Sequence, residues 1–256
     1  MAASTKNPFT LKGKKILITG ASSGLGRQCA IRCSYSGASV ILTGRNEMRL
    51  NQTFKDLSIG NHSYFEADLS EYGSYEKKIT DMLDDFGSTD GFIHAAGIEM
   101  TLPLNMMKPK HFQNLFNVNV ISGFELCRIL LIKRYLSKNS SLVFIASVMG
   151  ILGQSGKIGY CSSKGALVNG VKAMALEFAS QGIRVNSIIP AICKTKMSEE
   201  LLSNLTEEAR ENIIKMHPLG IGDPDDVALA AVYLLSNASK WITGSGLLVD
   251  GGYSAM

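Results

Sequence analysis

The sequence TGASSGLG, at Thr19–Gly26, links an apolar run at Lys14–Ile18 to a helix-favouring run at Arg27–Ser36. A strand, a glycine-rich turn and a helix in this order form an anion site, because glycines let the backbone approach a phosphate and the helix N-terminus directs N–H donors at it. The spacing Gly-x-x-x-Gly-x-Gly is not the Gly-x-Gly-x-x-Gly fingerprint, and a turn of this kind taken alone is equally typical of an ordinary strand-to-helix connection. The residues expected to contact a nucleotide are Gly20, Ser22, Ser23, Gly24, Leu25 and Gly26.

The second predicted strand, Ser39–Thr43, ends in Gly44 and Arg45. Dinucleotide-binding folds place the residue that contacts the adenosine ribose at about this distance from the glycine turn, and a carboxylate there accepts hydrogen bonds from a free 2′-hydroxyl. Gly44 has no carboxylate, whereas the Arg45 guanidinium suits a 2′-phosphate. The pattern favours NADP(H), and Glu47 keeps NAD(H) open as the alternative.

A possible proton donor lies further along the chain. Tyr160 and Lys164 are four residues apart, which places a phenol and an ammonium one turn apart on one helix face. A nearby cation lowers the pKa of a phenol from its usual value of about 10, so we expect Lys164 to tune Tyr160 for proton exchange with a carbonyl oxygen. Ser147 directly follows the apolar run Leu142–Ala146, so its hydroxyl is expected at the carboxyl end of a buried strand, where open parallel sheets bind ligands.

Apolar runs alternate with helix-favouring stretches along all 256 residues. Further strands are predicted at His62–Glu66 and Gly91–Ile93, and continuous apolar strands are typical of parallel sheets covered on both faces. No linker or internal repeat divides the chain. We therefore expect a single α/β domain, residues 1–256, with a Rossmann-type doubly wound sheet of about seven mostly parallel strands and helices on both faces.

Composition excludes several classes of function. The net charge is only +4 with Lys and Arg scattered, which argues against nucleic-acid binding. Met1–Thr10 lacks the apolar core of a signal peptide, and no stretch has the roughly 18 consecutive apolar residues of a membrane span. The five cysteines form no metal-binding pattern, and Cys29 and Cys33 are expected in the core. An odd cysteine count with no secretion signal predicts a reducing cytoplasm.

With these residues in order, the chain resembles the short-chain dehydrogenase/reductase family over nearly its whole length. The family's Thr-Gly-x-x-x-Gly-x-Gly appears as Thr19–Gly26, its Asn-Asn-Ala-Gly as His94–Gly97, and its adenine-contacting Asp as Asp68. The family's active-site Asn, Ser, Tyr and Lys match Asn119, Ser147, Tyr160 and Lys164. Arg184–Asn186, Pro190–Thr195 and Gly244–Gly252 resemble later family segments, with Gly244–Gly252 as the last strand.

The resemblance implies a role for each of these residues. Tyr160 would protonate the developing alkoxide, Ser147 would hydrogen-bond the substrate carbonyl, Lys164 would also bind the nicotinamide ribose, and Asn119 would order a water that links Lys164 to solvent. Two residues depart from the family pattern: His94 replaces an Asn that steadies the fourth strand, and Ala191 replaces a Gly beside the nicotinamide. The remaining cofactor contacts implied are Asp68, Leu69, Ala95, Ala96, Gly97, Tyr160, Lys164, Pro190, Ile192 and Thr195.

The substrate side is less defined by the sequence. Residues 191–219 match the family's mobile substrate loop, although the apolar positions of its helix-forming part, Lys194–Leu219, also suit inward packing. By position, the substrate contacts expected are Ser147, Met149, Gln154 and Tyr160.

Within the family the chain is most similar to 3-oxoacyl-acyl-carrier-protein reductases of fatty acid biosynthesis, which implies a 3-oxoacyl thioester, an acyl carrier protein as partner and a homotetramer built across the Tyr160 helix and the last strand. These reductases commonly have an Arg in the catalytic helix where this chain has Met174–Glu177, and Lys133 and Arg134 are the basic residues that would compensate. A dehydrogenase of a sugar, polyol or other small alcohol is the alternative, and a non-catalytic NADP-binding protein is a further one.

Overall fold

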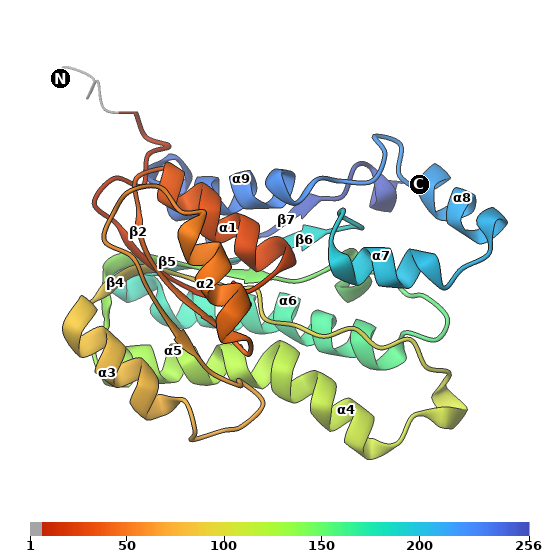
Figure 1. Ribbon diagram of the computed structural model, residues 1–256, viewed down its shortest axis with the longest axis horizontal. Coiled ribbons are helices and arrows are strands. Elements are labelled where there is room, and N and C mark those ends of the chain that lie inside the picture. The colour runs from red at the N-terminus through yellow and green to blue at the C-terminus, as the bar shows by residue number, and fades with distance from the viewer. Residues whose placement is uncertain (1–6, 256) are drawn as a thin grey trace.

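The computed structural model describes residues 7–255. Part of the stretch Met1–Thr10, on which the sequence predicts no signal peptide, therefore lies outside the described residues. Seven strands form one sheet in the order β3-β2-β1-β4-β5-β6-β7, and every neighbouring pair is parallel (Figure 1). The strands are β1 at Lys15–Thr19, β2 at Ser39–Gly44, β3 at Ser63–Glu66, β4 at Thr89–His94, β5 at Leu136–Ile145, β6 at Arg184–Pro190 and β7 at Gly246–Val249.

The strand order reverses beside β1, because β2 lies on one side of it and β4 on the other. Such a reversal opens a crevice at the carboxyl ends of the strands, where doubly wound folds bind ligands. The predicted fold class is confirmed. The described sheet is parallel throughout rather than mostly parallel.

Helices cover both faces of the sheet because successive strand side chains point to opposite sides. Ile16 and Ile18 pack in a core with α1 (Gly24–Tyr35), α2 (Glu47–Lys55) and α9 (Pro224–Leu235). Leu17, between them, packs in the opposite core with α3 (Glu76–Phe86), α5 (Ser122–Ile132) and α6 (Ile158–Phe178). Cys29 and Cys33 are fully buried in the first core, as predicted.

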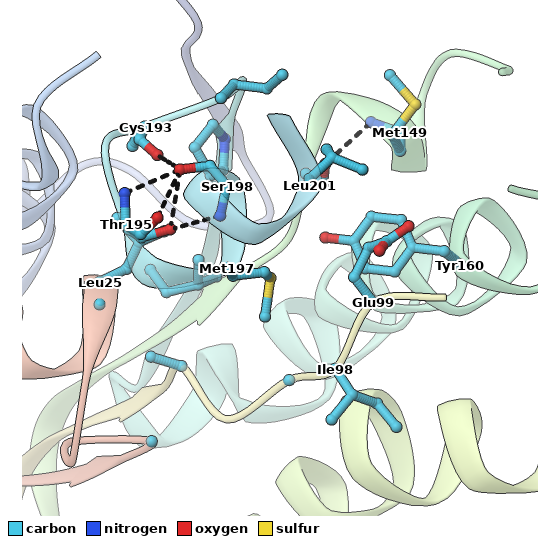
Figure 2. A pocket seen from close by; sticks show the side chains of 18 of the residues that line it. Leu25, Ile98, Glu99, Met149, Tyr160, Cys193, Thr195, Met197, Ser198 and Leu201 are labelled. Atoms are coloured by element: carbon cyan, nitrogen blue, oxygen red, sulfur yellow. Dashed lines mark hydrogen bonds between the residues drawn. The ribbon is translucent and has the colours of Figure 1, made fainter. Parts of the chain in front are cut away.

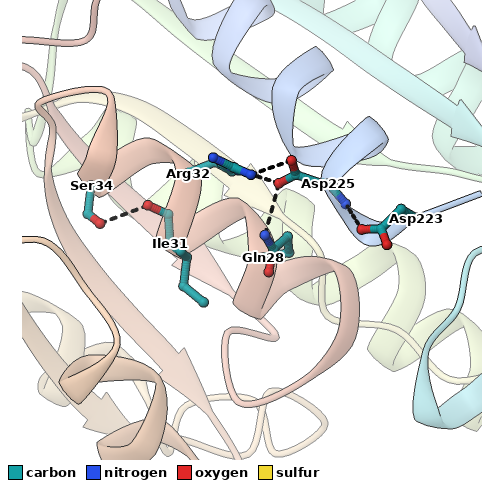
Figure 3. Close-up of polar contacts among 6 residues, drawn as sticks. All are labelled: Gln28, Ile31, Arg32, Ser34, Asp223 and Asp225. Atoms are coloured by element: carbon teal, nitrogen blue, oxygen red, sulfur yellow. Dashed lines mark hydrogen bonds and ion pairs between the residues drawn. The ribbon is translucent and has the colours of Figure 1, made fainter.

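A polar contact joins α1 to α9, two helices that lie side by side on one face (Figure 3). The Arg32 guanidinium donates to both carboxylate oxygens of Asp225, and Gln28 Nε2 donates to Asp225 Oδ1 at 2.9 Å. Asp223 caps the start of α9 by accepting from the Asp225 N–H at 2.9 Å. The Asp223 cap fixes the residue at which α9 begins, and the Arg32–Asp225 ion pair holds that end of α9 against α1.

The continuous helical segment Pro109–Ile132 is the one part of the described chain long and apolar enough to cross a membrane by length and composition, with 56% of its most apolar window buried. It comprises α4 (Pro109–Phe116), a π-helical turn at Asn117–Ile121 and α5. Polar residues such as Asn114, Asn117 and Glu125 interrupt it, so it is not a run of roughly 18 consecutive apolar residues. Its apolar residues, Leu126 and Leu130 among them, pack against the sheet as a core helix does.

Several boundaries differ from the predicted ones. The first helix starts at Gly24, three residues before the predicted Arg27, because Ser23 already has the extended backbone of an N-cap. The region Lys194–Leu219 forms two helices, α7 (Lys196–Ser203) and α8 (Glu207–Lys215), and Thr206 caps the second by accepting from the Ala209 N–H at 3.3 Å. The last strand is shorter than predicted, Gly246–Val249 rather than Gly244–Gly252, because Gly244, Gly251 and Gly252 adopt turn conformations with positive φ.

Candidate active site

A cavity of about 1120 Å³ opens at the carboxyl ends of the strands. It is lined by every residue predicted to bind cofactor or substrate, and among the predicted catalytic residues only Asn119 does not reach its wall. The fold thus brings together the glycine turn after β1, the Arg45 loop after β2, the small residues after β4 and Ser147 after β5. The predicted site residues that line the cavity are Gly20, Ser22, Ser23, Gly24, Leu25, Gly26, Arg45, Asp68, Leu69, Ala95, Ala96, Gly97, Ser147, Met149, Gln154, Tyr160, Lys164, Pro190, Ile192 and Thr195.

One end of the cavity is formed by the glycine turn and the N-terminus of α1. Gly26 packs so closely on the strand end that an added Cβ would lie 2.4 Å from the Gly20 carbonyl oxygen, and Gly20 itself has φ +66°. Ser23 occupies the N-cap without a side-chain capping bond, and the first turn of α1 has no acidic residue. The N–H groups of this turn and its partial positive charge therefore face the cavity without a competing carboxylate, as an anion site requires.

Two arginines flank the next part of the cavity. Arg45 directly follows β2, and Arg49 lies in the first turn of α2. Asn46 fixes the start of that helix, since its Oδ1 accepts from the Arg49 N–H at 2.9 Å. The sequence interpretation missed Arg49, although Asn46 is a typical N-cap residue and would have placed Arg49 in the first turn of a helix that begins beside Arg45. A pair of guanidinium groups here fits a phosphate on the adenosine ribose.

Asp68 lies on the opposite rim of this region. Burial opposes its ionisation, but hydrogen bonds from the Ser70 N–H and hydroxyl, at 2.9 and 2.7 Å, and the charge of Arg45 hold the pKa of the Asp68 carboxyl below its usual value. Asp68 is therefore an ionised acceptor in a fixed orientation, which is consistent with the predicted contact to an adenine amino group.

The predicted reaction centre consists of Ser147, Tyr160 and Lys164. Ser147 ends the strand run of β5 and accepts from the Met149 N–H at 3.2 Å, while Tyr160 and Lys164 lie on the first turns of α6. Lys164 is 5% exposed; its Nζ donates to the Ile145 carbonyl at 2.8 Å and lies 5.9 Å from the centre of the Tyr160 ring. Figure 2 shows the Tyr160 hydroxyl directed into the cavity, with Met197 and Leu201 of α7 on the far side.

The expectation that Lys164 lowers the pKa of Tyr160 is wrong for the protein without cofactor. Burial raises the pKa of Tyr160 to about 12, and the neighbouring Ser147 hydroxyl offsets only part of this increase. The physical reason is the position of the Lys164 ammonium, which is held at the Ile145 carbonyl beside the ring rather than at the phenol oxygen. Burial in turn lowers the pKa of Lys164 to about 8. Tyr160 is therefore a protonated phenol at neutral pH, the form that an acid needs.

Comparisons with known proteins agree with this geometry. A family model described as enoyl-(acyl carrier protein) reductase matches residues 20–254, which includes the glycine turn, Ser147, Tyr160 and Lys164. The chain belongs to the short-chain dehydrogenase/reductase family. Among its relatives, the 3-oxoacyl-(acyl-carrier-protein) reductase of Rickettsia prowazekii (strain Madrid E) is 33% identical over 94% of this chain and 97% of its own. The enzyme of the same name from Thermotoga maritima is 30% identical over 94% and 98%.

Solved structures show the same fold. A protein from Agrobacterium tumefaciens described as a 2-deoxy-D-gluconate 3-dehydrogenase, with bound NADP, has a TM-score of 0.85 and 31% identity over 98% of this chain and 100% of its own. A dehydrogenase/reductase from Sinorhizobium meliloti 1021 has a TM-score of 0.88 and 27% identity over 96% and 97%. As a member of this family, the protein is an oxidoreductase, and the family binds a nicotinamide cofactor.

The residues present fit such a cofactor. The N–H groups of the glycine turn would hold its pyrophosphate, and Arg45 and Arg49 would hold its adenosine end. Lys164 and Tyr160 would bind the nicotinamide ribose, at the end of the cavity that Ser147 lines. When bound, the cofactor supplies or accepts the hydride. The protein supplies placement, a protonated phenol at Tyr160 and a second hydroxyl at Ser147. Within residues 7–255 no group of three or more His, Cys, Asp or Glu side chains is arranged to hold a metal ion.

Asn119 lies behind the cavity of this short-chain dehydrogenase/reductase, in the π-helical turn between α4 and α5. Its Oδ1 accepts from the Ile98 N–H at 2.8 Å, and its Nδ2 donates to the Ile98 carbonyl at 3.0 Å and to Ser163 Oγ at 2.9 Å. The side chain is thus committed to the protein and holds the loop after β4 against α6. The predicted ordering of a water beside Lys164 is not tested by these contacts and stays a prediction.

His94 is a structural residue, as the sequence interpretation preferred. It is fully buried at the end of β4, and its Nδ1 lies 3.1 Å from Thr19 Oγ1, which also accepts from the Ala95 and Ala96 N–H groups at 3.1 Å. The Thr19 hydroxyl thereby joins the ends of β1 and β4 beside the His94 ring, whereas His94 Nε2 has no hydrogen-bond partner among the described residues. Burial and the charge of Lys164 lower the pKa of His94 to about 3.

The substrate side combines an apolar lid with a polar corner. Five apolar residues of the loop region 191–219 line the cavity, which is consistent with the predicted substrate loop: Met197, Leu201, Leu205, Ile213 and Met216. The sequence interpretation missed the polar corner, Glu99, Thr101 and Lys157, because these residues are contributed by two loops far apart in the chain.

Proposed function

We propose that this chain is an NADP(H)-dependent enzyme that reduces a carbonyl to an alcohol, with Tyr160 as the proton donor. The observation that carries the proposal is the continuity of one cavity from the Arg45–Arg49 pair to the Ser147–Tyr160–Lys164 cluster. The bound carbonyl oxygen would accept hydrogen bonds from Ser147 and Tyr160, and the Tyr160 proton would pass to the alkoxide as it forms. Lys164 would bind the nicotinamide ribose beside Tyr160.

The arginine pair supports NADP(H) as the cofactor. Both arginines line the cavity. Of the three residues between them, only Asn46 also lines it, so the carboxylate of Glu47 is not among the lining groups that could accept from a 2′-hydroxyl. The bound NADP named for the Agrobacterium relative is in keeping with this choice. Glu47 is not among the residues that line the cavity, which leaves NAD(H) as the weaker alternative.

A 3-oxoacyl thioester, carried by an acyl carrier protein in fatty acid biosynthesis, is the first proposed substrate, because the relatives found by sequence are named 3-oxoacyl reductases. Lys133 and Arg134 at the end of α5 are the basic groups proposed to meet an acidic carrier, since Leu176 takes the usual place of Arg on α6 and is 83% exposed. A cytoplasmic location belongs to the same proposal. The five described cysteines are free thiols, as it requires.

A sugar or polyol dehydrogenase is the second proposed function. The structures that match include proteins described as gluconate dehydrogenases, and the polar corner beside Tyr160 suits a substrate with several oxygens. A non-catalytic NADP-binding protein is a third reading, but it leaves the Ser147–Tyr160–Lys164 cluster without a role.

The test is NADPH oxidation with a short 3-oxoacyl thioester, a set of keto-sugars and small ketones. Turnover of the thioester that exceeds the others supports acyl-chain reduction, and turnover confined to keto-sugars supports the second function. NADPH binding without turnover of any carbonyl would overturn the enzyme proposal.

A further inference from the structure

A buried ion pair lies beside the proton donor, and the mechanism above makes no use of it. Lys157 Nζ donates to Glu99 Oε1 at 2.6 Å, and the two side chains are only 7% and 20% exposed. The Thr101 hydroxyl donates to the same Glu99 oxygen at 2.7 Å. Figure 2 shows the Glu99 carboxylate next to the Tyr160 ring. The pair therefore forms one wall of the substrate end of the cavity.

Backbone contacts hold this pair in a fixed position. The Leu102 N–H donates to the Gly156 carbonyl at 2.7 Å, which joins the loop after β4 to the loop before α6. Gly156 has φ +77°, and a Cβ there would lie 3.3 Å from the Thr101 side chain. Lys157 then occupies the N-cap of α6, three residues before Tyr160. Its ammonium lies 5.9 Å from the centre of the Tyr160 ring, so the pair and the acid share one rigid frame.

The pair has hydrogen-bonding capacity left over. Among residues 7–255, Glu99 Oε2 and two of the three ammonium protons of Lys157 have no protein partner, and both side chains line the cavity. Placing two charges out of water is costly unless their remaining hydrogen-bonding groups are also satisfied. A fully apolar substrate would leave these groups desolvated and unpaired. A substrate with a suitably placed oxygen would satisfy them.

We infer that the Glu99–Lys157 pair selects the substrate by binding a second oxygen, carried on the first or second carbon from the reacting carbonyl. This inference rests on the proposed carbonyl reduction. Lys157 Nζ lies 5.9 Å from the centre of the Tyr160 ring. If the reacting oxygen is bound by Ser147 and Tyr160, the substrate atoms one or two bonds from the carbonyl carbon are therefore the ones expected to lie beside Glu99 and Lys157. Lys157 donates to this oxygen, and Glu99 Oε2 accepts from it where it is a hydroxyl. A thioester carbonyl in a 3-oxoacyl chain and a hydroxyl in a keto-sugar both meet this requirement, whereas a plain ketone does not.

The experiment compares three substrates with wild-type protein and NADPH: 4-hydroxy-2-butanone, 2-pentanone, which has a methyl group where the first has a hydroxyl, and an acetoacetyl thioester of N-acetylcysteamine. We expect kcat/KM for at least one oxygenated substrate to exceed that for 2-pentanone by about tenfold or more, the factor typical of a hydrogen bond to a charged group. Preference for the hydroxyketone alone identifies a polyol-type substrate, and preference for the thioester alone identifies an acyl chain. Ratios near one for both would overturn the inference without any variant.

The variant that tests the pair is Glu99→Gln/Lys157→Met, which removes both charges together and leaves no lone buried ion. We expect the ratio of kcat/KM values between the preferred oxygenated substrate and 2-pentanone to fall at least fivefold, to about one or two. The ratio cancels any general effect on Tyr160. The matched control is Lys77→Met/Asp81→Asn, an exposed pair on α3, which should keep the wild-type ratio. Equal loss on every substrate would show a purely structural role and overturn the inference.

Circular dichroism checks that the double variant is folded. If it is not, Glu99→Gln/Lys157→Gln takes its place, because the two amides can still hydrogen-bond to each other but carry no charge, and a fall in the ratio is again expected. Wild-type protein that turns over none of the three substrates, nor any carbonyl of the wider set, would refute the proposed function itself. Wild-type turnover with a ratio that no variant of the pair changes would refute only the role of Glu99 and Lys157.

Discussion

The Lys164 ammonium lies 5.9 Å from the centre of the Tyr160 ring, while its hydrogen bond goes to the backbone of β5. The lysine therefore does not ionise the phenol in the free protein. We propose that Lys164 binds the nicotinamide ribose, and that Tyr160 donates its proton as an ordinary neutral phenol.

This arrangement predicts how reduction depends on pH. The pKa of Lys164 is about 8 and that of Tyr160 about 12, so raising the pH removes the charge of Lys164 first. We expect kcat/KM for reduction to be level below pH 7 and to fall about tenfold per pH unit above the pKa of Lys164. Lys164→Arg keeps its charge to higher pH and should move the fall upward. A wild-type profile that is flat to pH 10 would contradict this assignment.

Cofactor preference should depend on Arg45. Replacing Arg45 with Ala removes a charged partner of the 2′-phosphate, so we expect NADPH to bind about 10- to 100-fold more weakly, with NADH nearly unchanged. Fluorescence titration with each nucleotide measures this directly. Lys55→Ala, at an exposed position of α2 outside the cavity, is the control for a general loss of positive charge. Equal weakening of both nucleotides would show that Arg45 does not contact the 2′ position.

His94 should make the protein sensitive to acid. Its pKa is about 3 in the folded protein and about 6.5 when unfolded, so the unfolded chain binds one proton more between these values. Stability is therefore lost as the pH falls from 6.5 toward 3, by up to about 1.4 kcal/mol per pH unit. Urea unfolding at pH 7.5 and 5, at one protein concentration, should show wild type losing about 2 kcal/mol more than His94→Asn. Identical losses in the two proteins would mean that His94 is not the group responsible.

Assembly into a homotetramer remains a prediction from family resemblance, and two exposed apolar side chains are consistent with it. Leu176 on α6 is 83% exposed and Leu248 on the edge strand β7 is 47% exposed. We expect light scattering to give a mass near four chains for the wild type, and near two chains for Leu176→Asp and for Leu248→Asp separately. Ile59→Asp, on a fully exposed loop residue, is the control. A monomeric wild type would refute the tetramer.

The glycine turn and the Tyr160–Lys164 spacing were predictable because each is a local pattern. A strand, a turn and a helix follow one another over Lys14–Ser36, and four residues on one helix fix a side-chain pair. The order of the motifs then placed Asp68, Ser147 and Pro190 on one cavity, because parallel strands end at the same edge of a sheet.

Contacts between distant segments were not predictable from the sequence. Glu99 and Lys157 are 58 positions apart, and nothing local to either residue indicates the other. The predicted direction of the Tyr160 pKa shift was wrong for a related reason. The helical spacing to Lys164 is local, but the burial of Tyr160 and the bond from Lys164 to the Ile145 carbonyl depend on how α6 packs against β5. The sequence analysis treated Lys194–Leu219 as one helix-forming region. In the structure this region contains two helices, α7 and α8, and Thr206 caps the start of the second.

The most direct test of this account compares wild type with Tyr160→Phe in NADPH-dependent reduction of the best carbonyl substrate, with NADPH affinity measured on the same samples. The account predicts that kcat falls about 100- to 10,000-fold while the affinity for NADPH changes by less than about threefold. A Tyr160→Phe protein that retains more than about a tenth of the wild-type kcat would contradict the role of Tyr160 as the proton donor.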